Sequence, residues 1–292
     1  MVSRLLIALL GLVVTGTALP AQSSVWKVTR GKHSLYLGGT LHLLRPSDFP
    51  LPAEFNAAFA ASATLVFETD ITRLQSPEMQ QVVAARGVFA DGRSLETELS
   101  PKAWNAVQDY CAKSGTPIAQ VRHYKPWLFT VIVTATELRK AGISAEGVDV
   151  HFFKRAGIVG KTTDALETFE QQVDFLVNMG AGHESEMIAQ TLEDLAELPR
   201  ILEEVLTAWR TGDISAIDSL LLDDVRSHYP AIFKDLIVDR NNAWLPKLDA
   251  MLKSAEVEFV LVGAGHLAGP EGLLNRLRRR GYSVEQIKAA AK

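Results

Sequence analysis

Cysteine is nearly absent from this sequence, because Cys111 is the only one in 292 residues. An intrachain disulfide is therefore impossible, although a chain of this length buries enough apolar surface to fold without one. Cys111 lies in the segment WNAVQDYCAKSG, whose pattern is typical of a helix. A lone cysteine in such a segment packs as a small hydrophobic residue more often than it reacts. The sequence thus disfavours a cysteine hydrolase.

Long basic runs and the common catalytic signatures are also missing. The net charge is −4, and the only short basic cluster, residues 278–280, ends a helix-like segment, where cations suit the helix dipole. We therefore expect no binding to nucleic acid through bulk charge. No HExxH, GxSxG, Walker loop or GxGxxG in a suitable context is present. These absences count against ordinary zinc peptidases, α/β-hydrolases and enzymes that bind nucleotides or dinucleotides.

The only long hydrophobic run lies at the N-terminus. Arg4 precedes the apolar run 5–14, and mostly small residues follow up to Ala21. This order is typical of a secretory signal peptide, and the run is shorter than the ~20 residues that a membrane span needs. We expect residues 1–21 to be a signal peptide cleaved near Ala21. This predicts a periplasmic or secreted protein without membrane attachment after cleavage, and an uncleaved anchor is the alternative.

The chain has the composition of a globular protein, with 47% hydrophobic and 22% charged residues. Alternating apolar and polar residues around Gly31 predict a hairpin in which residues 25–29 pair with residues 34–37. The nearly continuous apolar run in ATLVFETD predicts a strand that is buried on both faces. Near the C-terminus, VEFVLVGAGH predicts a strand, residues 270–280 a helix, and YSVEQI a last strand.

Between these two ends the pattern is mostly helical. Helices are expected over residues 76–140, with breaks at Gly87, Asp91-Gly92, Ser100-Pro101 and 113–117, and over residues 146–254, with one short strand at Ile158–Gly160. No repeat with a period of roughly 20–50 residues is present. The expected fold class is α/β, of an α+β-like kind. A central mixed sheet forms from the N- and C-terminal segments and carries a large helical insertion, in one domain over residues 22–292.

Three of the expected strands end in polar residues that carry chemistry. One strand runs through GGTLH to His42, a second ends at Glu68, and a third runs through GAGH to His266. In open α/β sheets, binding sites form beyond the carboxyl ends of the strands. If the three strands are parallel neighbours, these side chains converge although 224 positions separate the two histidines.

Two imidazoles and a carboxylate support two mechanisms of hydrolysis. They can bind a divalent metal that lowers the pKa of a bound water, so His42, Glu68 and His266 are candidate metal ligands. Alternatively, one histidine acts as a general base on water while the carboxylate orients it. Both mechanisms make the three residues candidate catalytic residues, and the sequence leaves the choice between them open.

Residues beside these positions have candidate supporting roles. Glycines let a substrate approach the backbone closely, so Gly39, Gly263 and Gly265 are candidate substrate contacts. Asp70, two residues after Glu68, is a candidate partner of that carboxylate. Both histidines are expected to face a wet cleft and therefore to contribute little to packing.

These motifs resemble the TraB/GumN family, which is related to the Tiki proteases and the erythromycin esterases. The matching segments are GGTLHLL, LVFETD, KPWL, GVDVHF, LET at 166–168, RNNAW at 240–244 and VGAGHLAGPEGLLNRLRRRGYSVEQI, which together span about residues 24–288. The resemblance implies a central sheet with helical insertions and a hydrolytic centre at His42, Glu68 and His266. Tiki relatives are described as metal-dependent proteases that favour manganese or cobalt, and erythromycin esterases as working without a metal.

Three further residues acquire roles from this resemblance. Arg240 is a candidate catalytic residue that steadies an oxyanion or a substrate carboxylate as a planar donor, and a surface ion pair with Asp235 or Asp239 is the alternative. Asp149 is expected to hold a neighbouring element rather than to take part in catalysis. Glu167 is a candidate second acidic group near the mouth of the site, and capping of a helix is the alternative.

The residues predict an exported hydrolase with a His/Glu/His centre, and the resemblance to the Tiki group implies a peptidase-like activity with a divalent metal, manganese or cobalt. Its expected substrate is a peptide or a small ester. Two alternatives stay open, namely a metal-independent esterase and a non-catalytic envelope-binding protein of the same fold. A haem carrier is disfavoured because the sequence contains no Cys-x-x-Cys-His.

Overall fold

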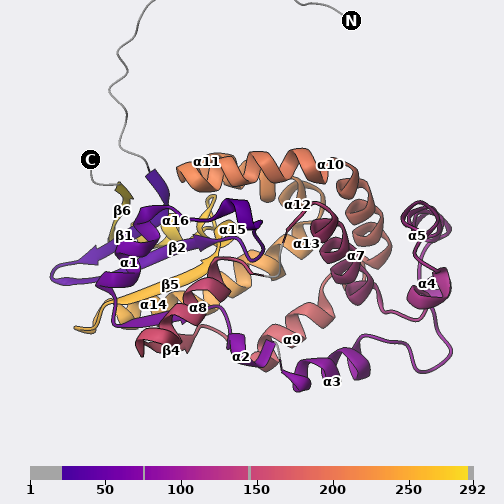
Figure 1. Cartoon of the computed structure of the whole chain (residues 1–292), viewed down its shortest axis with the longest axis horizontal. Helices are drawn as coiled ribbons and strands as arrows, with labels where there is room; N and C mark the ends of the chain where they lie inside the picture. Colours follow the sequence, from indigo (N-terminus) through magenta and orange to yellow (C-terminus); the bar gives the residue numbers. More distant parts are fainter. Residues whose placement is uncertain (1–21, 75, 144–145, 289–292) are drawn as a thin grey trace, which may run out of the picture.

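The computed structural model describes residues 22–74, 76–143 and 146–288, and the predicted signal peptide lies outside these residues. The centre of the described chain is a six-stranded sheet in the order β4-β3-β5-β2-β1-β6. The strands are β1 (Gln22–Arg30), β2 (His33–Thr40), β3 (Thr64–Phe67), β4 (Thr162–Ala165), β5 (Glu258–Gly263) and β6 (Ser283–Lys288). Figure 1 shows the sheet at one end of the molecule, where strands from both ends of the chain lie side by side.

Strands from the two ends of the chain pair as the sequence predicts. β1 and β2 form an antiparallel hairpin in which Val25 lies opposite Gly38 and Thr29 opposite Ser34. Gly31, in the turn, has a φ of 60°, which glycine adopts without strain. β2, β5, β3 and β4 run parallel to one another, and β6 pairs antiparallel with β1. This mixed sheet, interrupted by a long helical section, confirms the predicted fold class.

Helices fill the chain between the strands and cover both faces of the sheet. Their bounds are α1 (Ala53–Ala61), α2 (Ile71–Leu74), α3 (Pro77–Arg86), α4 (Leu95–Glu98), α5 (Pro101–Ser114), α6 (Ile118–Val121), α7 (Pro126–Lys140), α8 (Val148–Val159), α9 (Phe169–Asn178), α10 (Glu184–Thr211), α11 (Ile214–Leu221), α12 (Asp223–His228), α13 (Pro230–Phe233), α14 (Arg240–Met251), α15 (Ala264–Leu267) and α16 (Leu273–Arg279). A 3₁₀ turn spans Pro46–Asp48, and a π-helical stretch, Lys234–Asp239, leads directly into α14. None of the helices in the described ranges combines the length and the apolar character that a membrane span requires.

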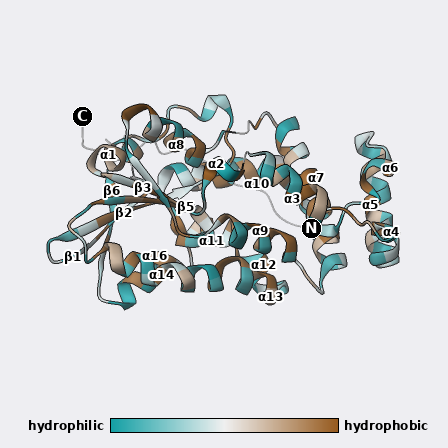
Figure 2. Cartoon of the chain, turned by 90° about the horizontal axis from the view of Figure 1, so that it is seen from below, coloured by the Kyte–Doolittle hydropathy of each residue, from teal (hydrophilic) through white to brown (hydrophobic). Residues whose placement is uncertain are grey.

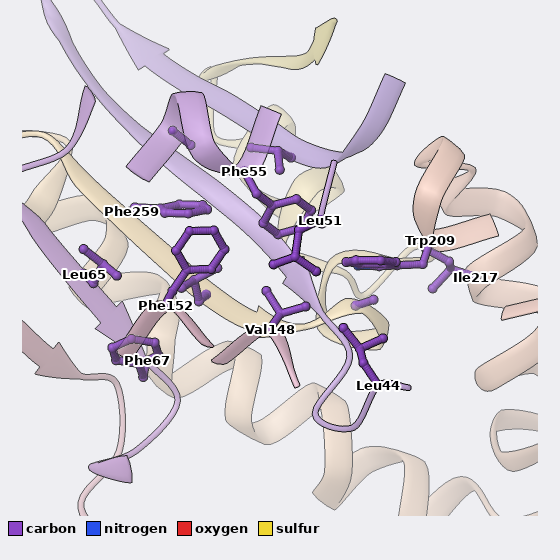
Figure 3. Close-up of a cluster of buried hydrophobic side chains, with 14 of the residues drawn as sticks. Leu44, Leu51, Phe55, Leu65, Phe67, Val148, Phe152, Trp209, Ile217 and Phe259 are labelled. Atoms are coloured by element: carbon purple, nitrogen blue, oxygen red, sulfur yellow. The ribbon is translucent and has the colours of Figure 1, made fainter. Parts of the chain in front are cut away.

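Two hydrophobic clusters hold the sheet, one on each face. In β5, Phe259 and Leu261 belong to the first cluster, and Val260 and Val262 belong to the second, as the two-residue period of a strand requires. The first cluster packs the sheet against α1, α8, α10 and α11, and the second packs it against α14 and α16. Figure 3 shows the aromatic centre of the first cluster, formed by Phe55, Phe152, Trp209 and Phe259.

A third hydrophobic cluster lies away from the sheet, among α4, α5, α6, α7 and α10. Figure 2 shows α4, α5 and α6 at the end of the molecule opposite the tips of the strands. Cys111 is buried in this cluster, and burial raises the pKa of its thiol, so the cysteine is inert as expected. α5 begins where the sequence predicts, because Ser100 accepts a hydrogen bond from the Ala103 N–H and Pro101 occupies the first turn.

The predicted strand at Ile158–Gly160 is wrong. These residues form the last turn of α8 and its C-cap, where Gly160 has a φ of 71°, and the strand begins two residues later at Thr162. The β-branched pair Ile158 and Val159 is typical of a buried strand, yet both side chains are exposed on the helix. β4 itself is polar because it lies at the edge of the sheet, so hydrophobicity gave no sign of it.

Gly147 determines how closely α8 approaches the end of β2. The N–H of Val148 donates to the carbonyl of Leu41 at 3.0 Å, which joins the first turn of α8 to the chain just after β2. A Cβ atom on Gly147 would lie 2.2 Å from the carbonyl carbon and oxygen of His42. Only glycine permits this contact without displacement of one backbone segment.

We expect Gly147→Ala to lower the free energy of unfolding by about 1–3 kcal/mol, because α8 or the backbone of His42 must move to admit the methyl group. Gly157→Ala, in the same helix, is the matched control, since nothing lies within 4 Å of its Cβ position. Alanine should stabilise that helical position by about 0.5–1 kcal/mol. Urea denaturation of both variants measures the difference, and equal stabilities would contradict the close approach of α8 to His42.

Candidate active site

Four parallel strands end at one edge of the sheet, and each supplies a polar side chain there. His42 lies two residues after β2, Glu68 directly after β3, Glu167 two residues after β4, and His266 in α15, directly after β5. The carboxyl ends of parallel strands meet at the same edge, which is where α/β folds place their ligands. The structure thus brings together the two histidines and the glutamate of the sequence hypothesis, and it adds a fourth strand end.

One carboxylate oxygen, Glu68 Oε1, lies at the centre of this group. It is 4.0 Å from His42 Nε2 and 4.0 Å from His266 Nε2, so the two nitrogens are no more than twice that distance apart. Glu68 Oε1 also accepts a hydrogen bond from the Gly263 N–H at 2.7 Å. A Cβ atom on Gly263 would lie 3.3 Å from both Glu68 Oε1 and His42 Nε2. The absence of that atom leaves space for a small ligand atom between the three groups.

Asp149, in the first turn of α8, holds His42 in one orientation. The Nδ1–H of His42 donates to Asp149 Oδ2 at 2.8 Å, which leaves Nε2 as the acceptor of the neutral ring. The negative charge of Asp149 raises the pKa of His42 from 6.5 to about 9, against the opposing effect of burial. The His42 side chain is nevertheless 61% exposed. The expected role of Asp149, to hold a neighbouring element, thus takes the form of orienting a histidine of the site.

His266 lies in the opposite environment. Its side chain is only 7% exposed, and its ring centroid is 4.4 Å from that of Trp244. Its Nδ1–H donates to Asn241 Oδ1 at 2.9 Å, and the amide of Asn241 is fixed because Nδ2 donates to the carbonyls of His266 and Glu271. Burial lowers the pKa of His266 to about 3, so the ring is neutral near pH 7. The expectation that both histidines face a wet cleft is therefore wrong for His266.

Arg240 joins the groups that line the back of the site. Its Nη2 donates to Glu68 Oε2 at 2.7 Å, its Nε to Glu167 Oε1 at 2.7 Å, and its Nη1 to His266 Nε2 at 3.0 Å. The side chain is 11% exposed, and the guanidinium lies 4.8 Å from the ring centroid of Trp244. Burial raises the pKa of Glu68, but the positive charge of Arg240 and the neighbouring histidines outweigh it and hold this pKa well below its usual range.

The position of Arg240 decides between the roles considered for it. Asp239 pairs with Lys234 instead, so the surface ion pair is not the arrangement found. Because the guanidinium already binds Glu68, Glu167 and His266, it is placed to position those groups rather than to meet a substrate. Glu167 is likewise engaged with Arg240, and the cap of α9 is Thr168, whose hydroxyl accepts from the Gln171 N–H.

Other residues that the sequence singled out lie outside the centre. Asp70 accepts hydrogen bonds from the N–H and hydroxyl of Thr72 at the start of α2, and its side chain is exposed rather than joined to Glu68. Gly39 and Gly265 face hydrophobic side chains of neighbouring helices. Of the three glycines proposed as substrate contacts, only Gly263 borders the centre.

A cavity of about 230 Å³ opens in front of these groups. Its lining consists of His42, Phe67, Glu68, Thr69, Ile71, Leu74, Asp149, Val150 and Gln172. Apolar walls with a few convergent polar groups are typical of a ligand-binding site. His266 and Arg240 do not line this cavity, so the structure divides the site into a front, where His42 and Glu68 border the cavity, and a back, where Arg240 and His266 lie behind Glu68.

The donor atoms suit a divalent metal in their chemistry. Two imidazole nitrogens and a carboxylate oxygen are ligands that zinc, manganese and cobalt accept, and the Nδ1–H partners Asp149 and Asn241 are typical supports of ligating histidines. The space over Gly263 lies between the donors. In the described part of the chain, however, no three His, Cys, Asp or Glu side chains are arranged to hold a metal ion. The Nε2 of His266 already accepts a hydrogen bond from Arg240, so a metal bound by all three donors would have to replace this hydrogen bond.

Three side chains of the site were missed by the sequence analysis. Asn241 holds His266, Trp244 donates from Nε1 to Glu167 Oε1 at 3.0 Å, and Gln172 Oε1 accepts from Arg240 at 3.1 Å. The sequence did contain a signal for Trp244, because Arg240 and Trp244 are four residues apart and therefore lie on the same face of a helix. The π-helical stretch before Arg240 is a feature that recurs at functional sites.

Comparisons with known proteins identify the family of this chain. A family model described as the TraB/PrgY/gumN family matches residues 24–286. Metalloprotease TIKI1 of Danio rerio is 23% identical over 91% of this chain and 63% of its own length, and Metalloprotease TIKI2 of Xenopus tropicalis is 24% identical over 91% and 60%. Metalloprotease TIKI1 of Homo sapiens is 24% identical over 91% and 62%. The chain thus spans about three fifths of the length of these curated relatives. No solved structure matches it significantly.

The pKa values of His42 and His266 should be shifted in opposite directions from the ordinary histidine value of 6.5. We expect NMR of the imidazole signals to show His42 protonated at pH 7, with a pKa near 9, and His266 neutral down to about pH 3. Because the folded chain binds the His42 proton more tightly than the unfolded chain, this pair stabilises the fold below about pH 6.5, and the effect is lost as the pH rises through about 9.

Two aspartate variants test whether Asp149 itself, rather than any nearby negative charge, raises the pKa of His42. Asp149→Asn should lower the pKa of His42 toward 6.5, since it removes the charge that raises it. Asp70→Asn is the matched control, because Asp70 hydrogen-bonds to Thr72 rather than to His42. An unchanged His42 pKa in Asp149→Asn would contradict the proposed pair.

Proposed function

Because the chain belongs to the TraB/PrgY/gumN family and places His42 and Glu68 in one cavity with His266 behind Glu68, we propose that it is a hydrolase of peptide-like substrates. The observation that carries this proposal is the position of Glu68 Oε1, which lies 4.0 Å from the Nε2 atoms of both His42 and His266. The curated relatives are named metalloproteases, which favours an amide bond over an ester as the bond that is cleaved.

In the proposed reaction, His42 accepts a proton from water in the space over Gly263 in those molecules whose ring is neutral, so the rate should rise with pH until about 9. Asp149 holds the ring so that Nε2 faces this space and makes the nitrogen more basic. The water oxygen forms a bond to the substrate carbonyl carbon, the bond from that carbon to the leaving nitrogen breaks, and His42 returns the proton to the leaving amine. Atoms and charge balance without another reactant.

Glu68 receives its orientation from both sides of the site. The N–H of Gly263 fixes one oxygen and Arg240 the other, so the carboxylate stays ionised and is pointed at the water. Arg240 and His266 act as positioning residues in this scheme, since both lie behind Glu68 and neither lines the cavity. A divalent metal bound by His42, Glu68 and His266 would supply a Lewis acid that lowers the pKa of the attacking water.

We expect His42→Ala to lower kcat/KM on an unstructured peptide at least about 100-fold, the contribution typical of a general base. The thermal midpoint should change by only a few degrees, because the side chain is 61% exposed and contributes little packing. His228→Ala is the matched control, since its ring is 67% exposed on α12 and away from the site. His266→Ala should instead cost about 1–3 kcal/mol of stability, because it leaves the buried Oδ1 of Asn241 without its donor.

The same assay, run on peptides and small esters with and without a chelator, addresses the role of a metal. If the three donors hold an ion, chelation abolishes activity and manganese or cobalt restores it. Glu68→Gln should then bind the ion more weakly, so that excess metal partly restores its rate. Full activity of His42→Ala would contradict the hydrolase. Binding of peptides without turnover by the unmodified protein would favour an envelope-binding protein.

The proposed hydrolase acts outside the cytoplasm. The support is the charged, apolar and small-residue order of residues 1–21, which is typical of a secretory signal. We expect the mature chain of exported protein to begin near Gln22, and N-terminal sequencing of that material measures it. A mature protein that retains residues 5–14 would favour an uncleaved anchor instead.

A further inference from the structure

β4 lies at the edge of the sheet beside the proposed centre. In the described chain it pairs only with β3, and its residues Thr162, Thr163 and Asp164 are exposed. Figure 1 shows β4 at the margin of the sheet next to α8. An exposed edge strand presents a row of N–H and C=O groups that another extended chain can pair with.

The hydrogen bonds between β3 and β4 identify which backbone groups of β4 face away from the sheet. The N–H of Leu166 donates to the carbonyl of Phe67 at 2.8 Å, so the backbone of Leu166 is turned toward β3. Backbone groups alternate along a strand, which turns Asp164 toward β3 and Thr163 and Ala165 outward. The N–H of Ala165 indeed donates to its neighbour's carboxylate, Asp164 Oδ1, at 2.8 Å. No described residue outside β3 hydrogen-bonds to the backbone of Thr163.

A second cavity connects this edge to the candidate active site. Its volume is about 310 Å³, and its lining is Phe67, Thr69, Asp70, Ile71, Thr72, Phe153, Thr163, Asp164 and Ala165. Phe67, Thr69 and Ile71 also line the cavity that contains His42 and Glu68. The two cavities are therefore neighbours along the carboxyl ends of β3 and β4.

The chemistry of this groove indicates what it accepts. Asp70 and Asp164 line the second cavity, and no Lys or Arg lies among its lining residues. At the other end of β4, Ile158 and Val159 are 83% and 59% exposed, more than the other exposed large hydrophobic side chains of the described chain. The second cavity thus offers backbone groups and negative charge next to the centre, and the exposed Ile158 and Val159 lie in the last turn of α8, just before β4.

We propose that the substrate is an extended polypeptide segment that adds to β4 as a further strand and continues across the second cavity to His42 and Glu68. This inference rests on the proposed hydrolase function and deepens it. Main-chain hydrogen bonds to Thr163 hold the segment, and basic side chains of the segment match the acidic lining of the second cavity. Thr163 lies opposite Leu65, three residues before Glu68, so bound backbone passes the centre about 10 Å farther on.

A small ester cannot form main-chain hydrogen bonds along β4. The cavity at His42 holds only a few atoms of a substrate, and an edge strand recognises main chain rather than one functional group. A folded protein offers free extended backbone only at an edge strand of its own, whereas a flexible segment offers it along its whole length. The geometry therefore favours an unfolded segment or a flexible terminus as the substrate.

The test measures binding of a labelled peptide of about ten alternating Val and Lys residues, long enough to cover β4 and the groove. Its matched twin carries N-methyl groups on alternate residues and cannot donate those hydrogen bonds. Fluorescence polarisation with the His42→Ala chain, which does not consume the peptide, gives Kd. We expect the N-methylated twin to bind at least about fivefold more weakly, as the loss of one or two backbone hydrogen bonds predicts.

Two substitutions at Thr163 test the strand itself. Thr163→Pro removes an outward N–H and no ladder bond, which an edge strand tolerates, and it should raise the Kd and the KM for the peptide at least about fivefold with kcat retained. Thr163→Val keeps the N–H and is the matched control, with constants within about twofold of the parent. Thermal unfolding verifies that each variant is folded.

The outcomes separate this inference from the proposed function. If the peptide and its N-methylated twin bind equally well, strand addition is wrong, whether or not Thr163→Pro folds. Strand addition is also wrong if folded Thr163→Pro hydrolyses the peptide with unchanged kinetic constants. If the unmodified protein hydrolyses nothing but the peptide binds with the expected sensitivity, the hydrolase fails while strand addition stands. If peptides are hydrolysed but neither N-methylation nor Thr163→Pro weakens binding, the hydrolase is supported and strand addition to β4 is wrong.

Discussion

A buried guanidinium that must be neutralised is the interaction on which this site depends. Arg240 is 11% exposed, and an unpaired charge at such a position would be strongly destabilising. Glu68 after β3 and Glu167 after β4 supply the negative charge, and His266 after β5 supplies an acceptor. One side chain on α14 thereby fixes the ends of three strands relative to one another. The burial of Trp244 beneath the guanidinium keeps water away from these contacts.

The same interaction makes the two histidines unequal. His266 donates from Nδ1 to an amide and accepts at Nε2 from Arg240, so both nitrogens are engaged and the ring stays neutral. His42 is bound only through Nδ1, by Asp149, and presents Nε2 to the cavity. The chemistry at the front of the site therefore falls to His42, and the buried half gives it a rigid support. A metal at this centre has to compete with Arg240 for His266.

The sheet provides two surfaces for the same reaction. Four parallel strands deliver the polar groups at their carboxyl ends, and the outermost strand, β4, leaves its outer edge exposed next to them. The cavities at His42 and at Thr163 share a wall built from β3 and α2. In the proposed reaction, the strand that positions Glu167 would also offer backbone groups to the substrate, so that binding and chemistry would use neighbouring strands of one sheet.

The sequence by itself determined the hairpin, the buried strands and the polar residues that end them, because these depend on local alternation and on glycine at turns. It indicated His42, Glu68 and His266 for the same reason. It misplaced β4, since an edge strand needs no hydrophobic pattern, and Asn241 gave no local signal at all. Which groups pair with which was decided only by the tertiary structure, because burial removes water as a partner and forces each buried polar group to find one in the fold.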